Sequence, residues 1–193
     1  YHINLMLGKI KYTDEGVVNT MKNWRKALDA GCFIDNHQNY SWQEAQPALI
    51  NGEAAMYLMG NFLVPNLPQE TQDNLDYWQF PDINPGMARG EDAPTDLIFM
   101  PANAQNKDNA KKFLEFVAQA ENIEAIAGAI QNLPTHKDAA PLDDRFLKKG
   151  AKVLAASKTA QFYDRDTTPE MASAGMQGFQ DFMLNPDDMM DIL

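Results

Sequence analysis

The stretch Ile50-Asn-Gly-Glu-Ala-Ala-Met-Tyr-Leu-Met-Gly-Asn-Phe62 joins an expected helix to a short apolar run and then to a new turn. Its Asn-Gly pair is a typical helix end, since glycine adopts the left-handed conformation that closes a helix. The run 54–59 is continuously apolar and long enough for one buried strand. Asn61 is a favourable N-cap for a brief following helix. The stretch therefore predicts a helix–strand–helix order.

The sequence on both sides predicts more helix. Apolar residues between positions 13 and 30 recur at three- and four-residue spacing, which is typical of one amphipathic helix ended by Gly31. Ser41-Trp-Gln-Glu44 is a capping box, in which each polar side chain bonds an amide that the helix leaves unpaired. Further helices are predicted over 61–67, from 106 to 117, over 121–129, 142–156 and 169–184, and from 185 onward.

Strands are predicted only in short segments, at 54–59, 75–80 and 97–100. Strands that alternate with helices indicate an α/β chain, here one in which helix outweighs strand. Sheets usually have about five or six strands, so these segments make a thin sheet. We therefore expect the chain to be part of a longer protein whose N-terminal portion completes the sheet, which agrees with a start at Tyr1 instead of Met.

Composition excludes several classes of protein. The net charge of −11 argues against a nucleic-acid binder, because a phosphate backbone requires a basic face. Hydrophobic residues make up 45% and charged residues 22%, as in packed globular domains. No apolar run approaches the roughly 18 residues of a membrane helix. The lone Cys32 excludes an internal disulfide or a cysteine-rich zinc site, and its apolar neighbours predict a buried, inert thiol.

Motifs for catalysis are missing from the sequence. His2, His37 and His136 are scattered, and no metal-ligand, dinucleotide, phosphate-loop or nucleophile-elbow pattern occurs. Neighbouring acids such as Asp164 and Asp166 are usually solvated or cap helices, so a glycosidase carboxylate pair stays the less favoured alternative. We expect no catalytic residue, no metal and no cofactor.

Aromatic residues beside polar planar groups suggest a sugar site instead. Sugars present apolar C–H faces and a rim of hydroxyls, so they require a flat ring together with hydrogen-bonding groups. Trp42 lies at a helix start, Phe62 follows a strand, and Tyr163 lies next to Arg165 and its acidic neighbours. Taken singly, each is better explained as core or as a surface ion pair.

Motifs in a fixed order carry a family resemblance. The stretch 50–62 resembles the signature G-[KE]-x-A-M-x-x-x-G-x-[WF] of the extracellular solute-binding proteins of bacterial sugar ABC transporters, family 1, the maltose-binding-protein-like group. Residues 97–116 are similar to the family's strand and following helix, 132–135 to its "g-x-lP" segment, and 161–172 to the segment before its late helices. The resemblance spans nearly all of the chain.

The resemblance implies a periplasmic-binding-protein-like fold of type II, in which two α/β lobes joined by hinge crossings close on a ligand. The chain would be the C-terminal half of such a protein, a helix-rich fragment with short strands made mostly of the second lobe. Residues 1–94 would belong to the second lobe, 95–133 would cross to the first lobe, and 134–193 would return to the second.

The resemblance also implies ligand-binding residues. Phe62 falls where many members place a tryptophan that stacks on a sugar ring, and Asn61 beside it can bond a hydroxyl. Thr95 and Asp96 lie where the family's chain enters the cleft, and a carboxylate such as Asp96 accepts two charge-assisted hydroxyl bonds.

Three further ligand residues complete this set. Tyr163 and Arg165 lie in the late segment that borders the cleft, and Trp42 is assigned to the rim from its place at a helix start. The implied function is to bind a carbohydrate between the lobes and deliver it to an ABC import permease, without catalysis.

The implied setting is the periplasm, or the cell exterior with a membrane tether in Gram-positive organisms. The partners would be a sugar and the permease subunits, with no nucleic acid, and the full-length protein would be a monomer peripheral to the membrane. Two other classes stay open: a glycoside-processing enzyme that uses a carboxylate pair, and a helix-rich domain that binds basic proteins through its acidic surface.

Overall fold

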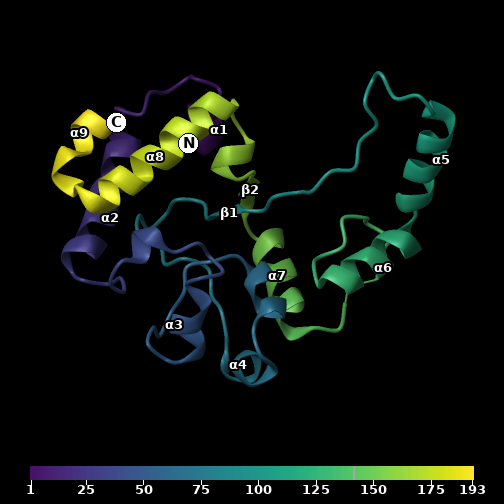
Figure 1. Cartoon of the computed structure of the whole chain (residues 1–193), viewed down its shortest axis with the longest axis horizontal. Coiled ribbons are helices and arrows are strands. Elements are labelled where there is room, and N and C mark those ends of the chain that lie inside the picture. Colours follow the sequence, from purple (N-terminus) through teal and green to yellow (C-terminus); the bar gives the residue numbers. More distant parts are fainter. Residues whose placement is uncertain (141) are drawn as a thin grey trace. The chain divides into compact units, whose positions relative to one another are not determined.

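The computed structural model describes residues 1–140 and 142–193, and helix exceeds strand among them, as predicted (Figure 1). The α-helices are α1 (His2–Met6), α2 (Glu15–Asp29), α3 (Gln46–Ile50), α4 (Gln69–Asn74), α5 (Lys107–Val117), α6 (Ala120–Ile130), α7 (Arg145–Ala155), α8 (Pro169–Leu184) and α9 (Met189–Ile192). The strands are β1 (Gly90–Asp92) and β2 (Lys158–Ala160), and the 3-10 helices are η1 (His37–Asn39), η2 (Asn61–Asn66), η3 (Tyr163–Arg165) and η4 (Pro186–Asp188). No helix in the described ranges has both the length and the apolar character needed to cross a membrane.

The long helices begin and end where their sequences predict. Helix α2 is followed by Gly31, whose φ of 66° is the left-handed conformation that ends a helix. Helix α8 begins at a proline, and the Thr168 hydroxyl accepts a bond from the amide of Met171 at 3.3 Å. In α7 the Asp144 carboxylate accepts from the amide of Leu147 at 2.8 Å. Side chains thus satisfy amides that the first turns leave unpaired.

The predicted capping box forms, but it precedes its helix. The Ser41 amide donates to the Glu44 carboxylate at 2.9 Å, and the Glu44 amide donates to the Ser41 hydroxyl at 3.3 Å. Residues 42–45 are turns, and α3 starts at Gln46 with Pro47 in its first turn. Proline is tolerated there because the first amides of a helix need no intrahelical partner, so the regular helix begins just before it.

The three predicted strands are wrong. Segments 54–59, 75–80 and 97–100 have no regular secondary structure, and Leu97 and Phe99 are 77% and 78% exposed. A strand requires backbone hydrogen bonds to a neighbour, and within the described residues the only sheet is the pair β1 and β2. Apolar composition suggests a strand from local sequence, but it does not supply the neighbouring strand that a ladder requires.

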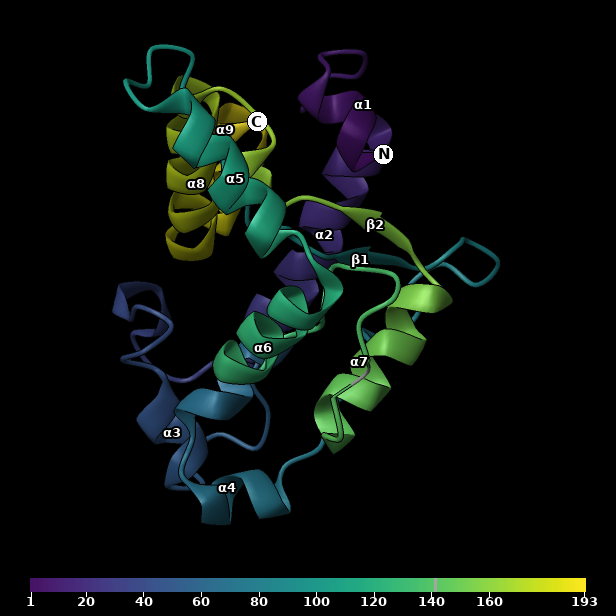
Figure 2. The ribbon, with the colours of Figure 1, turned by 90° about the vertical axis from the view of Figure 1, so that its right-hand side faces the viewer.

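The chain forms two compact units. Unit 1 comprises Tyr1–Tyr57, Asp92–Pro94 and Ala160–Leu193, and unit 2 comprises Leu58–Glu91 and Thr95–Thr159. The chain passes from one unit to the other inside both strands, which run side by side (Figure 2). The predicted lobe boundaries at 94 and 133 concern a longer protein and stay a prediction.

Unit 1 is built around α8. Phe182 has no exposed surface, and the ring of Trp24 from α2 packs at 5.1 Å from it and at 6.1 Å from Phe179, between ring centroids. Met21 of α2 is buried in the same region, and Figure 1 shows α2, α8 and α9 together. Helix α8 therefore provides the central apolar surface of unit 1.

Unit 2 has its core where η2 meets α7. Leu63 and Val64 of η2 and the following Leu67 are buried, and so are Phe146 and Leu147 of α7. A 3-10 helix has poor hydrogen-bond geometry, so η2 depends on this packing for its stability.

Cys32 is exposed, so the prediction of a buried thiol is wrong. It follows the left-handed Gly31 at the end of α2, where the chain turns away from the helix. Its apolar neighbour Phe33 is 39% exposed as well, so apolar sequence neighbours beyond the helix end do not imply burial.

Candidate functional site

The predicted ligand residues are divided between the two units. Unit 2 holds Asn61, Phe62, Thr95 and Asp96, and unit 1 holds Trp42, Tyr163 and Arg165. Within unit 2, Asn61 and Phe62 open the η2 turn, and within unit 1, Tyr163 and Arg165 begin and end the η3 turn.

In unit 2, the ring of Phe62 lies against a glycine. A Cβ atom on Gly60 would stand 2.4 Å from the Phe62 ring, so only glycine allows the ring to fold back over this backbone. The Asn66 side chain donates to the Phe62 carbonyl at 2.8 Å, and the adjacent Leu63 and Val64 anchor the turn in the core. The ring itself is only partly buried, so the turn presents an aromatic group on a rigid base.

Asn61 lies close to helix α7. A Cβ atom on the buried Gly150 would stand 3.7 Å from the Asn61 side-chain nitrogen and 3.1 Å from the Tyr77 hydroxyl. The Asn61 amide, the Tyr77 hydroxyl and the bare backbone of Gly150 therefore meet at one point. An amide group offers both donors and an acceptor to a ligand.

Tyr77 is fixed on α7 by its hydroxyl and its ring. The hydroxyl donates to the Phe146 carbonyl at 2.8 Å, and the two rings stack with centroids 6.2 Å apart. Burial raises the pKa of Tyr77, and the neighbouring Asp76 charge raises that pKa further. The hydroxyl thus stays protonated and remains a donor to the helix.

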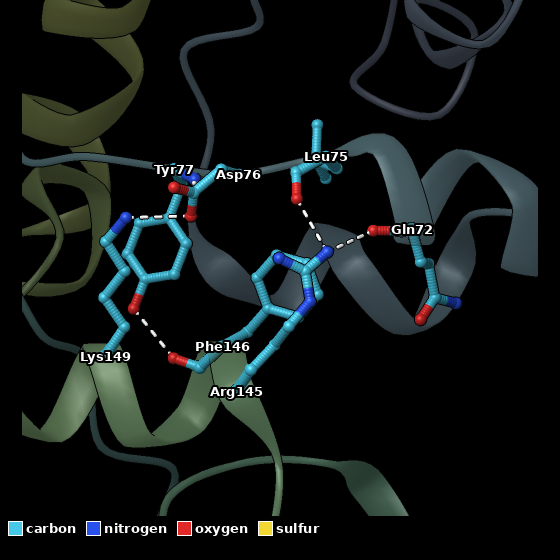
Figure 3. A network of polar contacts seen from close by, with 7 residues as sticks. All are labelled: Gln72, Leu75, Asp76, Tyr77, Arg145, Phe146 and Lys149. Atoms are coloured by element: carbon cyan, nitrogen blue, oxygen red, sulfur yellow. Dashed lines mark hydrogen bonds and ion pairs between the residues drawn. The ribbon is translucent and has the colours of Figure 1, made fainter.

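Basic residues of α7 bond the segment that leads into Tyr77 (Figure 3). The guanidinium of Arg145 donates to the Gln72 carbonyl at 2.5 Å and to the Leu75 carbonyl at 2.7 Å. The Lys149 ammonium bonds Asp76 at 2.8 Å, and this bond lowers the pKa of that carboxyl. Residues 72–77 are consequently tied to α7 at successive points.

Thr95 and Asp96 open the second segment of unit 2, directly after the chain leaves unit 1. Both side chains are exposed, on a stretch without regular secondary structure. A carboxylate at such a position can accept charge-assisted hydrogen bonds from sugar hydroxyls.

In unit 1, Tyr163 is packed against α8. A Cβ atom on Gly175 would stand 1.8 Å from its hydroxyl, and its ring meets the edge of Phe179 at 5.3 Å. The hydroxyl donates to the Met171 carbonyl at 3.2 Å and accepts from the Tyr12 hydroxyl at 2.5 Å. Burial and this bond raise the pKa of Tyr12 above its usual range. The Tyr163 hydroxyl therefore already has two protein partners.

Arg165 and Trp42 take different positions in unit 1. Arg165 is exposed, and its guanidinium carbon lies 5.6 Å from the centroid of the Phe162 ring, within cation–π range. Trp42 is partly buried, and its carbonyl accepts a bond from the Tyr57 hydroxyl at 2.9 Å. Among the residues that the structure describes, no His, Cys, Asp and Glu side chains gather into a metal site.

Sequence reasoning missed Tyr77 and Gly150. Tyr77 falls inside the predicted strand 75–80, although a part-buried phenol requires a hydrogen-bond partner. Gly150 lies in the middle of the predicted helix 142–156, where glycine is about 1 kcal/mol less favourable than alanine. This unfavourable glycine is the signal in the sequence that another side chain approaches the helix at position 150.

Comparison with known proteins gives a consistent result. Residues 5–156 match the family model of the bacterial extracellular solute-binding proteins. The chain is 28% identical over 162 residues to an uncharacterized ABC transporter extracellular-binding protein of Pyrococcus horikoshii, covering 82% of this chain and 35% of that protein.

A solved structure resembles the whole chain. It is the bacterial solute receptor AcbH, with a TM-score of 0.90 and 30% identity over 100% of this chain and 50% of that one. AcbH is described as having an exclusive substrate preference for β-D-galactopyranose. The likeness confirms the predicted fold class, and the chain spans half or less of the length of these proteins.

Proposed function

Because this chain belongs to the family of bacterial extracellular solute-binding proteins, we propose that its protein binds a carbohydrate and delivers it to an ABC import permease. The observation that carries the proposal is the likeness of the whole chain to a receptor described as preferring β-D-galactopyranose. D-Galactose is accordingly the first sugar to test.

The proposed chemistry of binding starts at the η2 turn. The apolar C–H face of a pyranose stacks on the ring of Phe62, which Gly60 and the core residues of the turn hold in place. Phenylalanine supplies a flat face without a hydrogen-bond donor, so the hydroxyls bond to Asn61, Thr95 and Asp96. Asp96 makes the strongest of these bonds because its carboxylate is charged.

Trp42, Tyr163 and Arg165 are proposed as further contacts in the cleft of the longer protein. Arg165 is suited to this role because its exposed guanidinium offers several donors. The Tyr163 hydroxyl is already bonded to Tyr12 and Met171, so it contributes mainly by holding the turn that carries Arg165. Ligand would favour the closed form by contacting both lobes, as hinge closure requires.

The proposed setting follows from the family. The protein acts in the periplasm, or at the outer face of cells that lack one, and releases its sugar to the permease. It binds as a monomer and catalyses no reaction.

The test is calorimetric titration of the full-length protein with D-galactose, D-glucose and maltose. We expect saturable binding of at least one sugar, abolished by Phe62→Ala and by Asp96→Ala. The matched control is Phe113→Ala, which removes a phenylalanine of α5 that is 55% exposed and outside the proposed site. A folded wild-type protein that binds amino acids or polyols but no sugar would overturn the proposal. Turnover of an aryl glycoside would favour the enzyme alternative.

A further inference from the structure

We propose that four side chains form a clamp that keeps β1 and β2 paired where the chain leaves unit 2. The clamp consists of Gln79, Asp82, Arg89 and Ser157, all of which belong to unit 2. Arg89 directly precedes β1, and Ser157 directly precedes β2. The inference goes beyond the proposed function and does not depend on a ligand.

The pair of β1 and β2 is short, and its strands are parallel. Each strand has 3 residues. The Lys158 amide donates to the Arg89 carbonyl at 3.1 Å, and the Ala93 amide donates to the Ala160 carbonyl at 2.9 Å. Both chains advance in the same direction between these bonds, so the strands are parallel and no hairpin turn joins them. Two strands alone are marginally stable in water, so this pair needs support from side chains.

Arg89 supplies the first part of the clamp. Its Nε and one terminal nitrogen donate to the two carboxylate oxygens of Asp82, each at 2.8 Å. Its other terminal nitrogen donates to the side-chain oxygen of Gln79 at 3.0 Å. The bonds from Arg89 lower the pKa of the Asp82 carboxyl, so the ion pair is present at neutral pH. This two-bond geometry fixes the guanidinium plane beside the start of β1.

Gln79 carries the clamp from one strand to the other. Its amide oxygen accepts from Arg89, and its amide nitrogen donates to the Ser157 hydroxyl at 3.0 Å. Gln79 and Ser157 are 78 positions apart in the chain, and this bond between them is partly buried. The segments that lead into β1 and β2 are therefore joined by side chains as well as by the backbone.

The clamp acts at the place where the chain passes between the units. The chain crosses from unit 2 to unit 1 within β1 and again within β2 (Figure 2). With the clamp closed, both crossings are held together at the ends that belong to unit 2. The side chains of Arg89 and Asp82 are 50% and 46% exposed, and ion pairs this exposed contribute little to overall stability. The effect of the clamp should therefore appear as less local opening of the strand pair.

The test is hydrogen exchange of the Lys158 amide, followed by NMR in the full-length protein. Arg89→Ala should lower the protection of this amide about tenfold and leave the protection of α8 unchanged. Arg25→Ala is the matched control, because Arg25 also binds two carboxylates, those of Asp29 and Asp187, within unit 1. It should leave the Lys158 protection within twofold of the wild type.

A double variant tests whether the side chains act as one clamp. Ser157→Ala should also lower the Lys158 protection, and adding it to Arg89→Ala should lower the protection by no more than a further twofold, because Gln79 links the two residues. Wild-type protection in Arg89→Ala, or single effects that multiply in full, would overturn the inference.

A milder variant covers the case of general destabilisation. If Arg89→Ala also loses protection in α8, the Asp82→Asn variant decides, since it keeps the arginine and removes only the charge that the arginine binds. A fall in protection at Lys158 without a fall in α8 would support the clamp, and unchanged protection at Lys158 would refute it.

Discussion

Each unit holds an aromatic ring against a glycine, and only one of the two rings carries a hydroxyl. In unit 1, the hydroxyl of Tyr163 lies against Gly175 and is bonded to protein groups. In unit 2, the ring of Phe62 folds over Gly60 and stays partly exposed. Contact with glycine therefore does not by itself distinguish the two rings, whereas the hydrogen bonds of the Tyr163 hydroxyl do.

The largest effect is expected at Gly175. In Gly175→Ala, the new methyl group would overlap the Tyr163 hydroxyl, which is held by two hydrogen bonds. Overpacking of this kind costs about 1–3 kcal/mol, and we expect the free energy of unfolding in urea to fall by about 2 kcal/mol. Unchanged stability would contradict the view that the Tyr163 ring is held in place, because the ring would then be free to move aside.

A smaller effect, on affinity, is expected at Phe62. Phe62→Ala removes the stacking face while the buried residues of η2 stay in place. We expect D-galactose affinity to fall at least tenfold, or about 1.4 kcal/mol, in calorimetric titration. Phe62→Trp should retain binding, since it keeps a flat face. A loss of stability as large as that of Gly175→Ala would contradict the view that the two rings have different roles.

Removing the hydroxyl of Tyr163 tests whether this residue acts in stability and not in ligand binding. Tyr163→Phe leaves the Tyr12 hydroxyl and the Met171 carbonyl without this partner, so the free energy of unfolding should fall by about 1 kcal/mol. The affinity for D-galactose should change less than in Phe62→Ala. The reverse order of effects would place the Tyr163 hydroxyl among the ligand contacts.

The smallest effect is expected from pH, through the ion pair of Asp76 and Lys149. Lys149 lowers the pKa of Asp76, so the pair stabilises the folded state at neutral pH and is lost as pH falls from about 4 through the lowered value. The stability difference between the wild type and Asp76→Asn, measured by urea unfolding, should therefore vanish in acid and shrink in high salt. A difference that grows in acid would contradict this role.

The sequence predicted the helices well because their signals are local. Apolar spacing and the left-handed Gly31 placed α2, and the proline of its first turn placed α8. The strand predictions failed because a strand depends on more than local sequence. Residues 97–100 have a strand-like composition, but a strand also requires a partner that is distant in the chain.

The candidate site was predictable only in part. Motif resemblance predicts Asn61 and Phe62 as ligand residues, and the structure adds that both lie in the η2 turn. Tyr77 and Gly150 could not be found this way, because their importance arises from an approach between segments about seventy residues apart. Sequence spacing carries no information about such a contact.

The bonds from Arg145 to the end of α4 have a consequence for the order of folding. Helix α4 has 6 residues, which is too short to persist alone in water. The carbonyl of Gln72 in this helix and that of Leu75 directly after it are bonded by Arg145, which comes 73 and 70 positions later in the chain. A nascent chain that ends before α7 thus lacks the group that completes α4. This turn should form late, and closing so long a loop should limit its rate.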